Sequence, residues 1–194
     1  MEIKEPINKY LDSLTKTINN LDKQEIDTLV SLIFEAYKNN KQIFIFGNGG
    51  SASTASHFAC DLNKGVSHGK DKKIRAMSLT DHMTCITAYS NDVSYDHIFS
   101  EQLKNFLNPG DLVIAISGSG NSKNILMAVE YANSKGVTTI GLTGYDGGQL
   151  RKIAKYSVNT NINDMEISED VHLSLCHMVK RTMLANINSE GHVI

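Results

Sequence analysis

Five short apolar runs separated by helical patterns constrain the fold of this chain more than any other feature. Residues 43–46 are all apolar and a glycine follows them, as expected of a strand buried on both faces of a parallel sheet. The predicted strands cover residues 42–46, 74–79, 111–117, 138–142 and 156–160. Helical spacing of apolar residues predicts helices over 52–63, 95–106, 121–135, 148–155 and 167–187.

This alternation predicts an α/β fold, a three-layer αβα sandwich around a five-stranded, parallel, doubly wound sheet. Two amphipathic helices within residues 7–40 precede the first strand and form a predicted N-terminal helical hairpin. The second of them begins at Asp22, with Glu25 three residues later, close to a capping box. Their apolar stripes need a surface to cover, either the flank of the same domain or another subunit.

Composition excludes several classes of protein. The 194 residues are 41% hydrophobic and 21% charged with a formal net charge of −2, which favours neither nucleic acid nor an anionic membrane as a partner. No window is apolar enough to span a membrane, and the first residues lack a signal peptide, so we expect a cytoplasmic protein. The cysteines, Cys60, Cys85 and Cys176, form no Cys-x-x-Cys pair and are predicted to be buried, reduced thiols.

Two loops that follow predicted strands carry small residues and hydroxyls at the start of a helix. They are Gly47–Ser51 and Ile116–Ser122, and neither matches a Walker loop or the Gly-x-Gly-x-x-Gly fingerprint. Free backbone N–H groups and the helix dipole attract an anion at such junctions. The second loop adds three hydroxyls, from Ser117, Ser119 and Ser122, which are enough to surround a phosphate. A tight turn without a ligand is the alternative interpretation of either loop alone.

Four side chains on two predicted helices are candidates for metal binding or proton transfer. His57 and Asp61 are four residues apart and share a helix face, a good spacing for two metal ligands or an acid–base pair. Glu169 and His177 lie on the last helix, eight residues apart, which is a rise of about 12 Å. If both bind one ion, either the helix starts late or two subunits share the site.

Six motifs occur in an order that resembles one family. They are Gly47-Asn-Gly-Gly-Ser51, His57-Phe-Ala, Ser90-Asn-Asp92, Ser117-Gly-Ser-Gly-Asn-Ser122, Leu142-Thr-Gly-x-Asp-Gly-Gly148 and Glu169-Asp-Val-His-x4-His177. With them the chain resembles the sugar isomerase (SIS) superfamily, in the branch of the phosphoheptose isomerases. The resemblance covers residues 5–185 and implies one SIS domain over 1–194, with helices used in oligomerisation over 1–40 and the αβα core over 41–194.

The resemblance also implies a reaction and a site. The reaction converts sedoheptulose 7-phosphate into D-glycero-D-manno-heptose 7-phosphate through an enediol, in a homotetramer whose active sites lie at subunit interfaces. It implies one Zn²⁺ per subunit, bound by His57, Asp61, Glu169 and His177, with Asp61 as the catalytic base and His177 as the catalytic acid. The implied substrate contacts are Asn48, Gly49, Gly50, Ser51, Asn91, Asp92, Ser117, Gly118, Ser119, Ser122 and Glu169.

Three of these positions depart from the family pattern. Asp61 stands where the family has glutamate, which retracts the carboxylate, and Glu169 stands where it has glutamine, which adds a negative charge. Gly118 removes one hydroxyl from the phosphate loop. A shifted substrate or another SIS reaction on an amino-sugar phosphate therefore stays open. The rival hypothesis is a non-catalytic phosphosugar-binding SIS tetramer, such as the relative that associates with the bacterial replication initiator.

Overall fold

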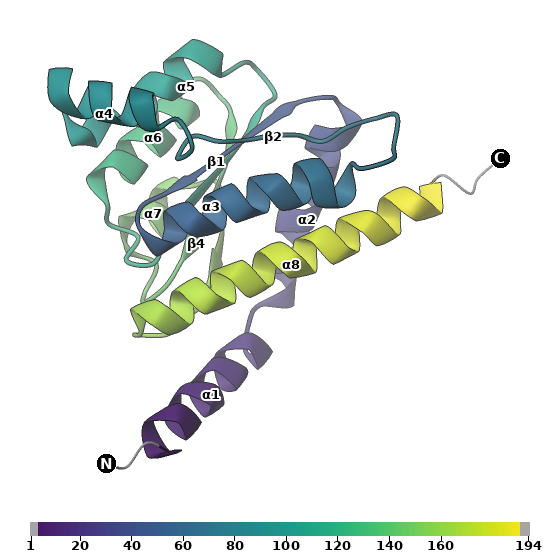
Figure 1. Ribbon diagram of the computed structural model, residues 1–194, viewed down its shortest axis with the longest axis vertical. Coiled ribbons are helices and arrows are strands. Elements are labelled where there is room, and N and C mark those ends of the chain that lie inside the picture. The colour runs from purple at the N-terminus through teal and green to yellow at the C-terminus, as the bar shows by residue number, and fades with distance from the viewer. Residues whose placement is uncertain (1–3, 191–194) are drawn as a thin grey trace.

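The computed structural model describes residues 4–190 and contains a five-stranded sheet flanked by helices (Figure 1). The strands pair in the order β2-β1-β3-β4-β5, and every pair is parallel, which confirms the predicted sheet. The order reverses between β1 and β3, and ligands of open α/β sheets bind at such a switch point. The strands are β1 (Gln42–Gly47), β2 (Arg75–Ser78), β3 (Leu112–Ser117), β4 (Thr138–Thr143) and β5 (Tyr156–Asn159).

Helices cover both faces of the sheet and make three layers. The helices are α1 (Lys4–Asn19), α2 (Lys23–Lys38), α3 (Gly50–Cys60), α4 (Met83–Asp92), α5 (Ser100–Phe106), α6 (Lys123–Ser134), α7 (Gly148–Ile153) and α8 (Met165–Glu190), with a π-helical turn η1 (Asp61–Val66) and a 3₁₀ turn η2 (Tyr95–His97). In β1, Ile43 and Ile45 pack against α2, α3 and α8, whereas Phe44 and Phe46 pack against α5, α6 and α7. Because successive side chains of a strand point to opposite faces of the sheet, β1 contributes residues to two separate hydrophobic cores.

The structure differs from the sequence-based expectation in three elements. Helix α4 was not predicted, the predicted helix over 95–106 is divided into η2 and α5, and the helix predicted over 52–63 turns into a π-helix at Asp61. Asp22 caps α2 as predicted, since its carboxylate accepts hydrogen bonds from the backbone N–H groups of the first turn. Glu25 does not complete a capping box, because it accepts hydrogen bonds from Asn159 N at 3.0 Å and Arg151 at 3.2 Å.

The burial of the cysteines was predicted wrongly for two of the three. Cys60 and Cys85 are exposed, and only Cys176 is buried. Cys60 ends α3 and points away from the core, while α4, which carries Cys85, has no buried residue within the described chain. Burial, with a contribution from Asp61, raises the pKa of the Cys176 thiol, so this thiol stays protonated at neutral pH. All three cysteines are free thiols in the described part of the chain.

The N-terminal helices are confirmed, but α1 leaves much of its apolar stripe uncovered. It contacts α8 and projects away from the body of the molecule (Figure 1). Ile7 and Leu11, one helical turn apart, are 52% and 53% exposed. Helix α4 likewise presents Met83, which is 65% exposed. Within residues 4–190, no helix has the length and hydropathy needed to cross a bilayer.

His172 on α8 is expected to make the stability of the fold depend on pH. It is fully buried, its Nε2 lies 3.2 Å from the carbonyl oxygen of Thr143, and its Nδ1 has no hydrogen-bond partner among the described residues. Burial lowers the pKa of His172 to about 4, against a weaker opposing effect of the hydrogen bond to Thr143. The ring is therefore neutral in the native state at neutral pH.

A folded-state pKa below the unfolded value means that acid favours the unfolded state. The stabilisation is complete well above pH 6.5 and decreases as the pH falls towards 4, by about 1.6 kcal/mol between pH 6.5 and 5. Urea denaturation of the wild type and of His172→Leu at both pH values measures this. Between these two pH values, the free energy of unfolding should fall by about 1.6 kcal/mol more in the wild type than in the variant. Equal decreases in the two proteins would contradict the assignment.

Candidate active site

A cavity of about 270 Å³ lies at the carboxyl ends of β1 and β3, at the switch point of the sheet. All the predicted substrate-binding residues line it except Asn91 and Asp92. The lining residues are Asn48, Gly49, Gly50, Ser51, Ile116, Ser117, Gly118, Ser119, Ser122, Met165 and Glu169. The two loops that the sequence singled out therefore form one site, with α8 as its third wall.

Two helix N-termini at this cavity make it suitable for an anion. Helix α3 begins at Gly50 after Gly49, whose φ of 55° lies in the left-handed region that glycine adopts without strain. Helix α6 has Ser122 as its N-cap, and the Ser122 side chain makes no capping hydrogen bond. This leaves its hydroxyl free for a ligand, together with the positive ends of two helix dipoles. The Ser117 hydroxyl oxygen accepts a hydrogen bond from Gly120 N at 3.1 Å, which orients the hydroxyl and leaves its O–H group as a donor.

The loop after β3 is held by the loop after β4. Gly144 N donates to the carbonyl oxygen of Gly118 at 2.8 Å, and Leu150 N donates to that of Gly120 at 2.9 Å. Gly120 has a φ of 64°, and a Cβ at this position would overlap the carbonyl oxygen of Gly147. The serine-rich loop is thus fixed by backbone contacts that leave no room for a side chain at position 120.

Gly120→Ala is expected to destabilise the protein more than Gly136→Ala, which is a matched control. Gly136 has a similar φ of 73°, but a Cβ there meets nothing within 4 Å. The control should cost about 1–2 kcal/mol for the left-handed backbone alone. Gly120→Ala should cost a further 1–3 kcal/mol for the overlap with Gly147. Urea denaturation measures the free energy of unfolding of the two variants. An equal decrease in both would show that the loop shifts to accommodate the added methyl group.

Two residues that the sequence did not single out orient Asn48 at the edge of the cavity. The Asn124 side chain, which is buried, exchanges amide hydrogen bonds with that of Asn48 at 2.9 Å. The Tyr95 hydroxyl also donates to Asn48 Oδ1, at 3.0 Å. Asn124 is the second residue of α6, two positions after Ser122, and its closeness to the serine-rich loop was the available signal. Tyr95 lies 47 residues from Asn48 in the chain, and no local pattern connects them.

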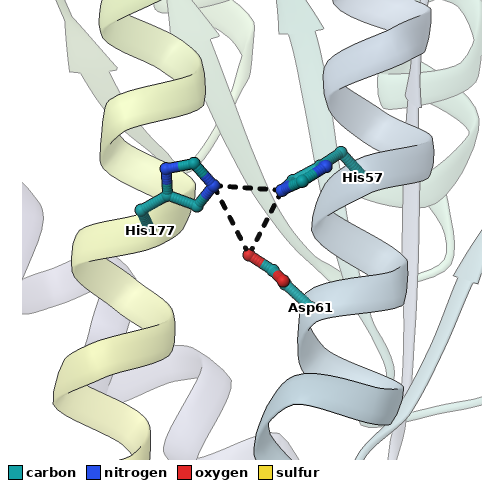
Figure 2. Close-up of side chains that lie close together, drawn as sticks. All are labelled: His57, Asp61 and His177. Carbon is teal, nitrogen blue, oxygen red and sulfur yellow. Dashed lines mark hydrogen bonds and ion pairs between the residues drawn. The ribbon is translucent and has the colours of Figure 1, made fainter.

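Three predicted metal ligands, His57, Asp61 and His177, converge between α3 and α8 (Figure 2). His57 Nε2 lies 3.0 Å from His177 Nε2, while Asp61 Oδ2 lies 3.5 Å from the first nitrogen and 3.8 Å from the second. Asp61 is buried and both imidazoles are about half exposed. The spacing of four residues does place His57 and Asp61 on one helix face, as predicted.

This arrangement fits a bound divalent cation. Asp61 Oδ2 is buried and has no hydrogen-bond donor within the described chain, a costly state for a carboxylate oxygen. Two imidazole nitrogens face the same point as this oxygen, and two neutral rings cannot both donate a proton there (Figure 2). Ligands about 2.0–2.1 Å from a tetrahedral Zn²⁺ lie about 3.3 Å from one another, close to the three separations measured here.

Glu169, the fourth predicted ligand, is not part of this cluster. Helix α8 is continuous from Met165 to Glu190, so Glu169 lies two turns before His177 and lines the cavity instead. Its carboxylate occupies the space beside Gly50 that a Cβ would need. Burial, and then Glu166 and Asp170, raise the pKa of Glu169. Within one chain Glu169 can bind a substrate hydroxyl; its role as a metal ligand stays a prediction.

Asn91 and Asp92 also lie apart from the cavity within one chain. They are exposed at the end of α4, where Asn91 Nδ2 donates to Asp92 Oδ1 at 2.8 Å. Neither residue is among those that line the cavity. Their predicted contact with substrate stays a prediction.

The sheet order, the cavity at its switch point and the three convergent ligands define a class, that of parallel α/β proteins with a polar site for a small anionic ligand. The SIS domain family matches residues 8–144. A probable phosphoheptose isomerase from Thermoplasma acidophilum is 37% identical over 88% of this chain and 93% of its own length. The chain belongs to the SIS domain family, in its phosphoheptose isomerase branch.

Two further comparisons agree with this assignment. A phosphoheptose isomerase from Sulfurimonas denitrificans is 36% identical over 97% of both chains. The solved structure of a phosphoheptose isomerase from Neisseria gonorrhoeae superposes with a TM-score of 0.83 at 28% identity, over 91% of this chain and 94% of that chain. The likeness therefore extends over nearly the whole length and not over the sheet alone.

Proposed function

We propose that this chain is a phosphoheptose isomerase, which converts sedoheptulose 7-phosphate into D-glycero-D-manno-heptose 7-phosphate in the biosynthesis of a heptose-containing glycan. The relatives that match over most of the chain carry the name of this enzyme. The structural observation that supports the proposal best is the placement of an anion site and a candidate metal site on the same two helices, α3 and α8.

The separation of these two sites suits a seven-carbon substrate. Gly50 and Glu169 line the cavity, whereas His57 and His177 lie seven and eight residues further along α3 and α8. At 1.5 Å per residue, this is about 10–12 Å along the helices. An extended chain of seven carbons with a terminal phosphate also spans about 10 Å, at roughly 1.2 Å per bond as in an extended backbone. With its phosphate in the cavity, such a substrate would have C1 and C2 within reach of the cluster.

The reaction needs two proton transfers, and the cluster offers a group for each. A proton leaves C1 of the ketose and one is returned to C2, while the hydroxyl proton moves from O1 to O2. Asp61 is our candidate for the base at carbon, because its Oδ2 faces the cluster without a hydrogen-bond donor. His177 is our candidate for the proton at oxygen, since its half-exposed ring can reach a ligand.

The cation that we propose is Zn²⁺, one per subunit. His57, Asp61 and His177 would hold it, since two imidazoles and a carboxylate form an ordinary zinc ligand set. When bound, a zinc ion supplies Lewis-acid polarisation of the substrate oxygens at C1 and C2. Glu169 is the proposed acceptor for a sugar hydroxyl in the cavity, and it would be a further metal ligand only if two subunits share the site.

We also propose that the chain works as a cytoplasmic homotetramer with its active sites at subunit interfaces. The exposed apolar residues of α1 and α4 support this, because a stripe of this kind is normally covered by another surface. A second copy on α4 would also bring Asn91 and Asp92 towards a cavity. Sedimentation equilibrium checks the assembly, with an expected mass near four times the 21.4 kDa of one chain.

The activity is tested by incubating the zinc-loaded protein with sedoheptulose 7-phosphate in deuterated water and following C1 and C2 by NMR. Formation of the aldose with deuterium at C2 is the expected result. Turnover of a different ketose phosphate alone would keep the mechanism and change the substrate. If the protein turns over no sugar phosphate and binds no metal, the result would favour the hypothesis of a non-catalytic phosphosugar-binding protein.

A further inference from the structure

Lys180 contacts the cluster of His57, Asp61 and His177 through Asp61. Its Nζ lies 2.6 Å from Asp61 Oδ1, the carboxylate oxygen that does not face the two imidazoles. Lys180 follows His177 by three residues on α8, so both side chains project from the same helix face. The Lys180 side chain is 31% exposed, against 9% for that of Asp61.

The neighbouring backbone leaves a notch for the Lys180 side chain. A Cβ at Gly65, in the π-helical turn η1, would lie 2.5 Å from Lys180 Cε and 3.4 Å from Asp61 Oδ1. The Lys180 side chain thus passes over Gly65, in space that the side chain of any larger residue at position 65 would occupy. Gly65 and Lys180, which are far apart in the sequence, together determine how the ammonium group reaches Asp61.

The two oxygens of Asp61 have different surroundings as a result. Oδ1 accepts a charge-assisted hydrogen bond from Lys180, whereas Oδ2 has no donor and faces both imidazoles. Without Lys180, the plane of this buried carboxylate could tilt about its Cβ–Cγ bond and turn the oxygen away from the imidazoles, because the terminal torsion of aspartate is broad. The ammonium restricts this tilt, because an intermediate orientation of the plane would break the strong interaction at Oδ1.

We propose that Lys180, seated over Gly65, is a positioning residue that fixes the plane of the Asp61 carboxylate, so that one oxygen is held by the ammonium and the other faces the metal and the substrate. The proposal rests on the function proposed above and extends it to a residue outside the predicted site. Groups that hold a ligating carboxylate orient it and tune the metal, and their loss commonly costs 10- to 100-fold in affinity or activity.

Lys180→Met tests the proposal with two readouts. The kcat should fall by about 10- to 100-fold with KM changed less than about threefold, because the phosphate site is untouched. The dissociation constant for Co²⁺, measured by its absorption spectrum, should rise by about tenfold or more. Lys104→Met removes a lysine from another ion pair, with Glu101, and should leave both readouts unchanged.

Two further variants separate position from charge. Lys180→Arg keeps a cation that can reach Asp61 and should restore most of the kcat and the Co²⁺ affinity. Gly65→Ala keeps the lysine but fills the notch, so it should reproduce the loss seen in Lys180→Met. In an Asp61→Asn background, Lys180→Met should add nothing further, since a residue that acts only through Asp61 is coupled to it completely.

The proposal is overturned if Lys180→Met behaves like Lys104→Met, or if its full effect persists in the Asp61→Asn background. A wild type that binds Co²⁺ but isomerises no sugar phosphate would refute the proposed function alone, because the Co²⁺ measurements would still decide the role of Lys180. A wild type that binds no Co²⁺ would overturn both the metal site and the positioning role.

Discussion

Asp61→Asn is expected to lower the kcat for isomerisation by about 10²- to 10⁴-fold, the contribution typical of a well-placed general base. Asparagine keeps the size of the side chain and one oxygen, but it cannot take a proton from carbon. Asp61 is buried between two histidines and Lys180, so few other groups can replace its function. The NMR assay in deuterated water measures the loss, and it also reports exchange of the C1 protons without turnover.

The metal content of the same variant separates the two roles of this carboxylate. Full occupancy with lost turnover would assign Asp61 as the base, whereas lost occupancy would assign it first as a ligand. Asp71→Asn, on the exposed loop before β2, is the matched control and should keep wild-type rates. A kcat for Asp61→Asn within tenfold of the wild type would exclude Asp61 as the base.

His177→Ala is expected to weaken metal binding by at least about 100-fold. It removes one of the three donors that face a common point, and even the loss of a group that only supports a ligand costs 10- to 100-fold. Competition with a fluorescent chelator measures the dissociation constant. His68→Ala, an exposed histidine outside the cluster, is the control and should not change it.

Thermodynamic linkage gives an independent readout for His177→Ala. Free zinc at about 100 times its dissociation constant should stabilise the wild type by about 2.7 kcal/mol, because the native state binds it. The variant should show almost none of this stabilisation at the same zinc concentration. Equal stabilisation of both proteins would mean that zinc binds elsewhere, and the cluster would then be an ordinary contact between two helices.

Much of the fold was readable from the sequence because the relevant signals are local. A strand buried on both faces has to be apolar throughout, and the run at 43–46 shows this without further context. The two loops at the switch point were also readable, since hydroxyls and glycines next to a helix start are adjacent in the chain. The pairing of His57 with Asp61 follows from helix geometry alone.

Helix α4 and the break at η1 were not readable for a physical reason. Helix α4 has no buried residue within the described chain, so it lacks the apolar periodicity that predicts a helix packed against a core. The π-helical turn depends on where Asp61 and Gly65 meet α8, a contact with residues more than a hundred positions away. Propensity in a single segment carries no information about such a partner.

The sequence by itself determined the parallel sheet, the two loops at the cavity and the types of ligand that the chain offers. Only the tertiary structure decided which of those ligands meet: His57, Asp61 and His177 do, while Glu169 stays at the cavity because α8 is one continuous helix. It also decided that Asp61 is buried with one oxygen held by Lys180 and the other free. Periodicity specifies the face of a helix on which a side chain lies, but burial and pairing arise only when two helices pack.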